Sequence, residues 1–356
     1  MKNKVIDFSG ENIYIGLDVH KKSWSATILT DELEHRTFTL PPGAEGLVKY
    51  VKKNFPGANY YSAYEAGFCG FGHHRDLLSF GINNIVVNAS DVPSTNKENT
   101  TKTDSIDSRK IAKALRTKSL RGIHVFEKSA EEFRSLARQR QIFQRDLRRY
   151  KQRIKSFLHY YNIIIPEILD GDNWSKAFEK WVGELHLDTI YGDSSLENLM
   201  IGYRFHKDQV RMVSKEIRAA ARKFHKKNYF LLRSIPGIGP LTSIAIITEI
   251  GDINRFQDFN KFCSYVGLMP MSFSSGETER IGGMTFRSNP WLRTMIVEAA
   301  WQAVRKDPAM MLYYKQHVSR GNGKRAIIKV ARKLLSRIRF VLKNQEPYQL
   351  GIIKSE

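Results

Sequence analysis

The sequence is poor in cysteine. Cys69 and Cys263 are the two cysteines among 356 residues, and they lie far apart with no CxxC pair. This usage argues against a disulfide framework and a structural zinc site, and it fits a reducing cytoplasm. No run approaches 18 consecutive apolar residues, and the first residues lack the apolar stretch of a signal peptide. We therefore expect a cytoplasmic protein that does not span a membrane.

Acidic residues are in deficit as well. The chain has 57 Lys and Arg against 36 Asp and Glu, a formal net charge of +21. Such a surplus indicates a polyanionic partner, of which nucleic acid is the commonest, and an anionic membrane surface is the alternative. Apolar residues make up 42% of the chain, which is enough to build the cores of two or three domains.

Strand and helix patterns alternate through the first third of the chain. Strand-like stretches occupy residues 12–29, 35–40, 58–67 and 83–90, and helical stretches occupy 43–55, 69–81 and 103–118. Strands interleaved with helices of this length predict an α/β layer. We assign this domain to residues 1–125.

Four acids of this domain stand at unusual places. Asp18 lies within an apolar strand and points away from the face that its apolar neighbours share. Glu65 falls near the end of another strand, and Asp104 and Asp107 open a helix. A carboxylate in such a strand is costly to bury without a partner. Strand ends and a following helix start can converge at one edge of an open sheet, where ligands bind.

These acids have two interpretations. Asp104 and Asp107 lie three residues apart on one helix face, with Cβ atoms roughly 5–6 Å apart, and would repel each other without a cation between them. The four carboxylates together could hold one or two Mg²⁺ ions for phosphoryl transfer. Alternatively, Thr103 caps an ordinary helix whose first-turn acids complement the macrodipole. His20 lies on the same strand face as Asp18 and would line the same cleft.

The middle of the chain, residues 126–228, has helical periodicity. Amphipathic stretches at 129–161 and 203–227 flank a break at 166–200, which predicts an antiparallel coiled-coil arm. A basic face on the first stretch is either a nucleic-acid contact, through Arg145, Arg148 and Arg149 above all, or a solvated surface. Its cations are Arg134, Arg138, Arg145, Arg148, Arg149, Lys151, Arg153 and Lys155.

The last region, residues 229–356, contains PGIGP at 236–240 between two helical runs. This is a helix–hairpin–helix signal, in which Gly237 and Gly239 let backbone N–H groups approach a DNA phosphate. A plain turn between packed helices is the alternative. The region ends in a basic helical stretch at 323–342, for which the sequence indicates no particular role.

A serine-rich loop, MPMSFSSGETERIGG, follows at 269–283. A serine beside a flexible glycine can present its hydroxyl to a phosphodiester, and nearby arginines can stabilise the transition-state charge. Such loops are more often simple turns. The residues concerned are Ser272, Ser274, Ser275, Gly276, Arg280 and Arg287.

Several of these stretches resemble a known family. YIGLDVHKKSWSATI, YEAGFCGFGHHRDL, VVNASDVP and KTDSIDSRKIAKAL resemble the N-terminal RuvC-like domain of DEDD transposases. LRSIPGIGPLTSIAIITEIGDINRFQDFNKFCSYVGLMP and SSGETERIGG resemble that family's C-terminal transposase domain. The chain thus resembles the insertion-sequence one-ten family, with its eleven-eleven subgroup.

The resemblance implies a ribonuclease-H-like N-terminal domain, a coiled-coil arm and a mostly α C-terminal domain. It makes Asp18, Glu65, Asp104 and Asp107 the D, E, D and D that bind Mg²⁺. The family's catalytic serine maps to Ser275. The family often has an acid at the preceding position, which is serine here, so the neighbouring hydroxyl stays an alternative.

The resemblance also implies a function and partners. Members use a non-coding bridge RNA that pairs with donor and target DNA, and they form dimers and tetramers in which two subunits complete each active site. The implied activity is RNA-guided DNA cleavage and strand exchange through a covalent phosphoserine link. A RuvC-like structure-specific nuclease of the Holliday-junction resolvase type and a non-catalytic nucleic-acid-binding module are the alternatives.

Overall fold

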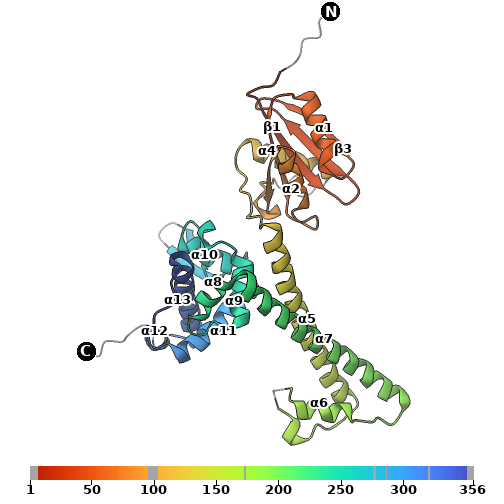
Figure 1. The fold of residues 1–356 in the computed structure, drawn as a ribbon, viewed down its shortest axis with the longest axis vertical. Helices are drawn as coiled ribbons and strands as arrows, with labels where there is room; N and C mark the ends of the chain where they lie inside the picture. The colour runs from red at the N-terminus through yellow and green to blue at the C-terminus, as the bar shows by residue number, and fades with distance from the viewer. Residues whose placement is uncertain are drawn as a thin grey trace, which may run out of the picture. The chain divides into compact units, whose positions relative to one another are not determined.

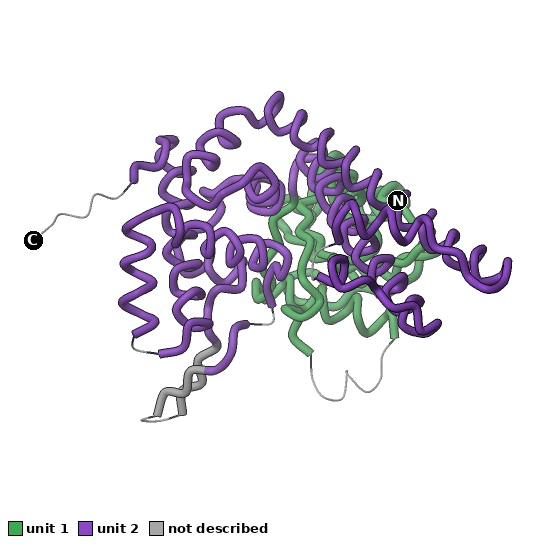
Figure 2. Tube along the Cα trace, turned by 90° about the horizontal axis from the view of Figure 1, so that it is seen from below, with its two compact units in different colours: residues 1–125 green, residues 126–356 purple. Residues whose placement is uncertain are grey.

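The computed structural model describes residues 7–94, 103–171, 174–275, 278–285, 287–319 and 321–350, with the backbone alone at 271–275 and 278–281. The chain divides into two compact units, residues 1–125 and 126–356 (Figure 2). The arm and the C-terminal helices both belong to the second unit, and their expected division after residue 228 stays a prediction.

The first unit contains a five-stranded mixed sheet in the order β3-β2-β1-β4-β5. β1 pairs antiparallel with β2 and parallel with β4, and β4 pairs parallel with β5. The α/β prediction is confirmed, and the sheet is consistent with the expected ribonuclease-H-like fold. The strands are β1 (Asn12–Val19), β2 (Trp24–Leu29), β3 (Glu34–Leu40), β4 (Asn59–Glu65) and β5 (Asn83–Val87).

The strand-like stretch at 12–29 is therefore two strands. The chain reverses between β1 and β2, where the amide of His20 donates to the carbonyl of Ser23 over 3.0 Å. Sequence reasoning did not place this turn because the stretch contains no proline, and its one glycine, Gly16, lies inside the strand rather than at the turn.

Helices cover both faces of this sheet (Figure 1). α1 (Ala44–Asn54) and α2 (Gly72–Ser79) pack on the face formed by the apolar residues of β1, which share one core cluster with Leu47 and Leu77. α4 (Asp104–Arg116) packs on the opposite face, the one toward which Asp18 points. The predicted separation of Asp18 from the apolar face of its strand is thus confirmed.

Gly16 allows α4 to lie directly on β1. A Cβ atom at Gly16 would lie 2.0 Å from the carbonyl oxygen of Ser108 and 2.4 Å from the amide nitrogen of Ala112. Tyr14, two residues earlier on the same face, packs with Ala112. α4 therefore runs antiparallel to β1, and its first turn reaches the end of the strand where Asp18 lies.

The second unit begins with the arm, formed by α5 (Lys128–Tyr160), α6 (Lys176–Gly183) and α7 (Ile190–Phe224). Leu158 of α5 shares a cluster with Leu196 of α7, and Ala137 shares another with Ala221, so the two long helices are antiparallel as predicted. α7 begins inside the expected break at 166–200.

The prediction placed the start of α7 too late because it counted the whole glycine- and acid-containing segment as a breaker. Thr189 caps the helix by accepting a hydrogen bond from the amide of Gly192 over 3.3 Å. Leu196, Met200 and Tyr203 are buried and extend the apolar seam from there.

The remainder of the second unit is mostly helical. Its core joins α9, α11 and α13, and β6 and β7 form a small antiparallel sheet. Among the described residues, no helix is long and apolar enough to cross a membrane. The elements are α8 (Lys226–Arg233), α9 (Pro240–Ile250), α10 (Phe259–Val266), β6 (Pro270–Ser275), β7 (Thr278–Met284), α11 (Pro290–Lys306), α12 (Pro308–Val318) and α13 (Gly323–Asn344).

A buried carboxylate joins the arm to this core. The side chain of Glu249 in α9 is 0% exposed. Its Oε2 accepts from Nη2 of Arg134 over 2.8 Å and from Nδ2 of Asn289 over 2.7 Å, and its Oε1 accepts from Nε of Arg138 over 2.7 Å. Arg134 and Arg138 were placed on the basic face of the arm, for which a nucleic-acid contact or a solvated surface was expected. Both guanidinium groups bind Glu249 instead of standing alone on that face.

We expect Gly16→Ala to lower the free energy of unfolding of the first unit by about 1–3 kcal/mol, because the new methyl group meets the backbone of α4. Hydrogen–deuterium exchange of residues 12–19 in rising urea would measure the loss. Gly46→Ala in α1 is the matched control, since its Cβ would meet Leu40 Cδ1 at an ordinary 3.7 Å. Equal protection of the two variants would contradict the close contact.

We expect Glu249→Ala to lower the free energy of unfolding of the second unit by about 3–5 kcal/mol, because two guanidinium groups lose a buried partner. Burial raises the pKa of Glu249, but hydrogen bonds from Arg138 and Arg134 outweigh it and hold the pKa below its usual value. The stabilisation is therefore present above pH 4.5 and is lost as the pH falls through the lowered pKa.

Urea titrations of the native chain and of Glu249→Gln at several pH values would test this dependence, which the amide should remove. Glu298→Ala, at an exposed position on α11, should change stability by less than about 0.5 kcal/mol.

Candidate active site

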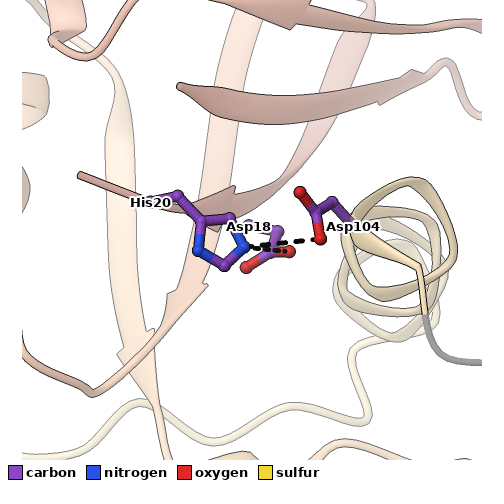
Figure 3. Close-up of side chains that lie close together, drawn as sticks. All are labelled: Asp18, His20 and Asp104. Atoms are coloured by element: carbon purple, nitrogen blue, oxygen red, sulfur yellow. Dashed lines mark hydrogen bonds and ion pairs between the residues drawn. The ribbon is translucent and has the colours of Figure 1, made fainter. Parts of the chain in front are cut away.

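Asp18, His20 and Asp104 meet at the end of β1 (Figure 3). Nε2 of His20 lies 3.1 Å from Oδ2 of Asp18 and 3.5 Å from Oδ1 of Asp104. One ligand atom from each residue lies within 4.8 Å of the other two. An ionised carboxylate only accepts hydrogen bonds, so Nε2 donates where it bonds to ionised Asp18, while Asp104 lies within ion-pair distance of it.

The positive charge near Asp18 is too small to offset the burial of its carboxylate. Its side chain is 22% exposed. Burial raises the pKa of Asp18, His20 partly offsets that rise, and the negative charges of Asp104 and Asp107 add to it. A cation bound between Asp18 and Asp104 would remove this destabilisation. The donor set of two carboxylates and one imidazole suits a divalent metal ion.

Asp107 lies beside this cluster but outside it. Its Oδ1 accepts from Nζ of Lys110, one turn along α4, over 3.2 Å, and both side chains are largely buried. Sequence reasoning missed Lys110, although its spacing of three residues from Asp107 is the signal for such a pair. Asp107 still acts on Asp18 through its charge.

Glu65 ends β4, the parallel neighbour of β1. The last paired residues of the two strands are Leu17 and Tyr64, and Asp18 and Glu65 follow them directly. Adjacent residues in register on parallel strands point to the same face, so Glu65 shares the face that α4 covers. Its carboxylate does not belong to the group formed by Asp18, His20 and Asp104. The four-acid set therefore stays a prediction.

The cations predicted on the arm have different environments. Arg145 and Arg148 are exposed, and Nη1 of Arg149 binds Oδ1 of Asp146 over 3.0 Å. Three others lie over aromatic rings of the arm itself. These pairs are Lys151 on Trp174, Arg153 on Tyr150 and Lys155 on Phe178.

The PGIGP turn connects α8 to α9. Gly237 has φ +88°, and a Cβ there would lie 2.3 Å from the carbonyl oxygen of Ala299. Packing against α11 thus accounts for this glycine. Gly239 faces open space and directly precedes α9. The assignment of the turn as a DNA-binding hairpin stays a prediction.

The serine segment is a β-hairpin rather than the expected loop. Ser275 ends β6 and pairs with Thr278 of β7 in an antiparallel ladder in which Ser272 also pairs with Ile281. Arg287 is exposed between this hairpin and α11. The side chains of Ser272, Ser274, Ser275 and Arg280, and all of Gly276, lie outside the described residues.

An α/β unit with acids gathered at the end of a strand, joined to a basic helical unit, has the organisation of a nucleic-acid-processing enzyme. Comparison with known proteins agrees. A transposase family model of the DEDD type, named for IS110, matches residues 15–163, and the model described as Transposase IS116/IS110/IS902 family matches residues 229–315. The chain belongs to the IS110 family of DEDD transposases.

Individual relatives are similar over much of the chain. It is 27% identical to the transposase-type protein y4qE of Sinorhizobium fredii over 263 residues, which are 73% of this chain and 62% of that protein. It is 24% identical to the transposase for insertion sequence element IS1533 of Leptospira borgpetersenii, over 82% and 85% of the two chains. A pilin gene-inverting protein of Moraxella bovis is 31% identical over 34% and 39%.

We expect Mg²⁺ to stabilise the first unit and Asp18→Asn to abolish that effect. In the native chain, a Mg²⁺ concentration one hundred times the dissociation constant would raise the free energy of unfolding by about 2.7 kcal/mol. Without divalent ions, we expect Asp18→Asn to raise the stability of the first unit instead of lowering it. The raised pKa means that ionised Asp18 lowers stability above its pKa, so the neutral amide should be slightly more stable at pH 7.

Hydrogen exchange of residues 12–19 with MgCl₂ or EDTA would measure both effects. Asp76→Asn is the matched control, because this exposed carboxylate lies on α2, on the other face of the sheet. A Mg²⁺-dependent gain that survives in Asp18→Asn would exclude this cluster as the metal site.

Proposed function

We propose that this chain is an insertion-sequence transposase that cuts and rejoins DNA strands under the guidance of a non-coding RNA. The observation that carries the proposal is the convergence of Asp18 and Asp104 from separate elements, with a raised pKa at Asp18. Family membership supports DNA as the substrate.

Asp18 and Asp104 are the residues that would hold Mg²⁺, with Glu65 and Asp107 as further ligands from the same sheet face. Their oxygens fit a hard cation, while the imidazole of His20 is the departure from the all-oxygen set that Mg²⁺ prefers. Bound Mg²⁺ supplies positive charge to the scissile phosphate. His20 would orient Asp18 through a hydrogen bond from Nε2 and lies within ion-pair distance of Asp104.

We assign the nucleophile to Ser275. Its Oγ attacks the scissile phosphorus, the bond from phosphorus to the 3′ oxygen breaks, and the DNA 5′ end stays attached to the serine. The serine hydroxyl gives up its proton to a base, and the departing 3′ oxygen gains one. That 3′ hydroxyl then attacks the phosphoserine link of the partner strand and restores Ser275. Arg280 and Arg287 would offset the charge that develops on the phosphate.

The basic arm and the PGIGP turn would bind the nucleic acids. Arg145, Arg148 and Arg149 are exposed on α5 and suit backbone phosphates of DNA or of the bridge RNA. Gly239 leaves the start of α9 open for a DNA phosphate. The metal-binding unit and the serine hairpin belong to different compact units, which agrees with an active site shared between subunits of a dimer or tetramer.

The test looks for a covalent protein–DNA complex that forms without any added crosslinking reagent. Native chain, expressed with the RNA encoded beside its gene, is incubated with labelled element-end DNA and run on a denaturing gel. Ser275→Ala should lose the covalent band and at least about a thousand-fold in cleavage rate. Asp104→Asn should lose both as well, and Ser274→Ala, the neighbouring hydroxyl, should keep them.

A Ser275→Ala protein that still cleaves would favour the alternative, a structure-specific nuclease of the Holliday-junction resolvase type that uses water. If Ser274→Ala alone loses the covalent band, the nucleophile is Ser274 and not Ser275. Ribonuclease treatment before DNA addition should abolish cleavage, and unchanged activity would remove the RNA from the proposal.

A further inference from the structure

The final basic stretch, for which no role was expected, forms one wall of a cavity in the second unit. The cavity has a volume of about 560 Å³. Lys329, Arg332, Lys333 and Arg337 line it from α13, and none of the described residues that line it is acidic. Positions three and four apart share a helix face, so these cations form one row.

Aromatic rings and an amide fix two of these cations in place. Nζ of Lys333 lies 4.4 Å from the ring centre of Tyr313, and Cζ of Arg332 lies 5.8 Å from that of Phe259. Nη2 of Arg332 also donates to Oδ1 of Asn260 over 2.9 Å. A cation held over an aromatic face loses less entropy when an anion binds than a mobile surface lysine does.

The two outer cations are exposed and complete the row. Lys329 and Arg337 are eight residues apart, about 12 Å along the helix axis. One strand of a duplex carries a phosphate about every 3.4 Å of axis, so this length suits three or four phosphates. No ion pair within the described residues neutralises any of the four cations of the row.

We propose that this row, Lys329, Arg332, Lys333 and Arg337, binds the phosphodiester backbone of a nucleic-acid strand. The row shares no residue with the Asp18 cluster, the arm or the PGIGP turn. The proposal rests on the proposed function only for the choice of ligand. Because binding is measured without cleavage, its failure and a failure of catalysis are distinguishable.

The test measures binding of the full chain to labelled 20-nucleotide single strands of DNA and of RNA across a salt series. A single strand gives a slope of log affinity against log salt of about 0.7 per phosphate contact. Lys329→Gln/Arg337→Gln should therefore reduce the slope by about 1.4 for the strand that uses the site. The size of the change with DNA and with RNA identifies the ligand.

Arg305→Gln/Lys306→Gln is the matched control, since it removes two exposed cations from the end of α11 outside the cavity. Acetylation footprinting of the native chain supplies a second readout, in which bound strand should protect Lys333 at least about three-fold more than Lys306. Equal slope changes in both double variants with both strands, together with no protection of Lys333, would overturn the proposal.

Discussion

The contact between Gly16 and the backbone of α4 is the constraint on which the candidate active site depends. Because a strand residue without a side chain faces Ser108 and Ala112, the helix lies flat on β1. The hydroxyl of Ser108 bonds to those of Ser25 and Thr27 at 3.2 and 2.9 Å, so the buried polar groups at this interface are satisfied. The first turn of α4 then reaches Asp18.

Sequence patterns predicted much of this unit because the relevant signals are local. Period-two alternation in β1 identified both its apolar face and the opposite orientation of Asp18, and the order of strands and helices predicted the layers. The relation between Asp104 and Asp18 is not local. It depends on how closely α4 approaches the sheet, and the sequence showed no sign that Gly16 sets that distance. The same limit applies to His20, whose spacing from Asp18 indicated a shared face but not its closeness to Asp104.

The arm shows where charge patterns mislead. A one-sided row of arginines predicted a nucleic-acid surface, yet Arg134 and Arg138 bind Glu249, more than a hundred residues away along the chain. Helical periodicity tells which residues share a face but not what that face meets. Periodicity also could not separate the serine hairpin from a loop, since short polar strands lack the apolar signal that identifies buried ones.

Glu249 and Asp18 are two carboxylates of this chain whose pKa values shift in opposite directions. Glu249 is fully buried, yet its pKa is lowered because Arg138 and Arg134 outweigh the effect of burial, and Asn289 supplies a further hydrogen bond. Asp18 is less buried, yet its pKa is raised, because burial outweighs the single histidine beside it and the negative charges of Asp104 and Asp107 add to the rise. Folding alone would favour removing such a cluster. The cluster at the end of β1 therefore agrees with the proposed cation site, because bound positive charge would offset a cost that folding alone leaves in place.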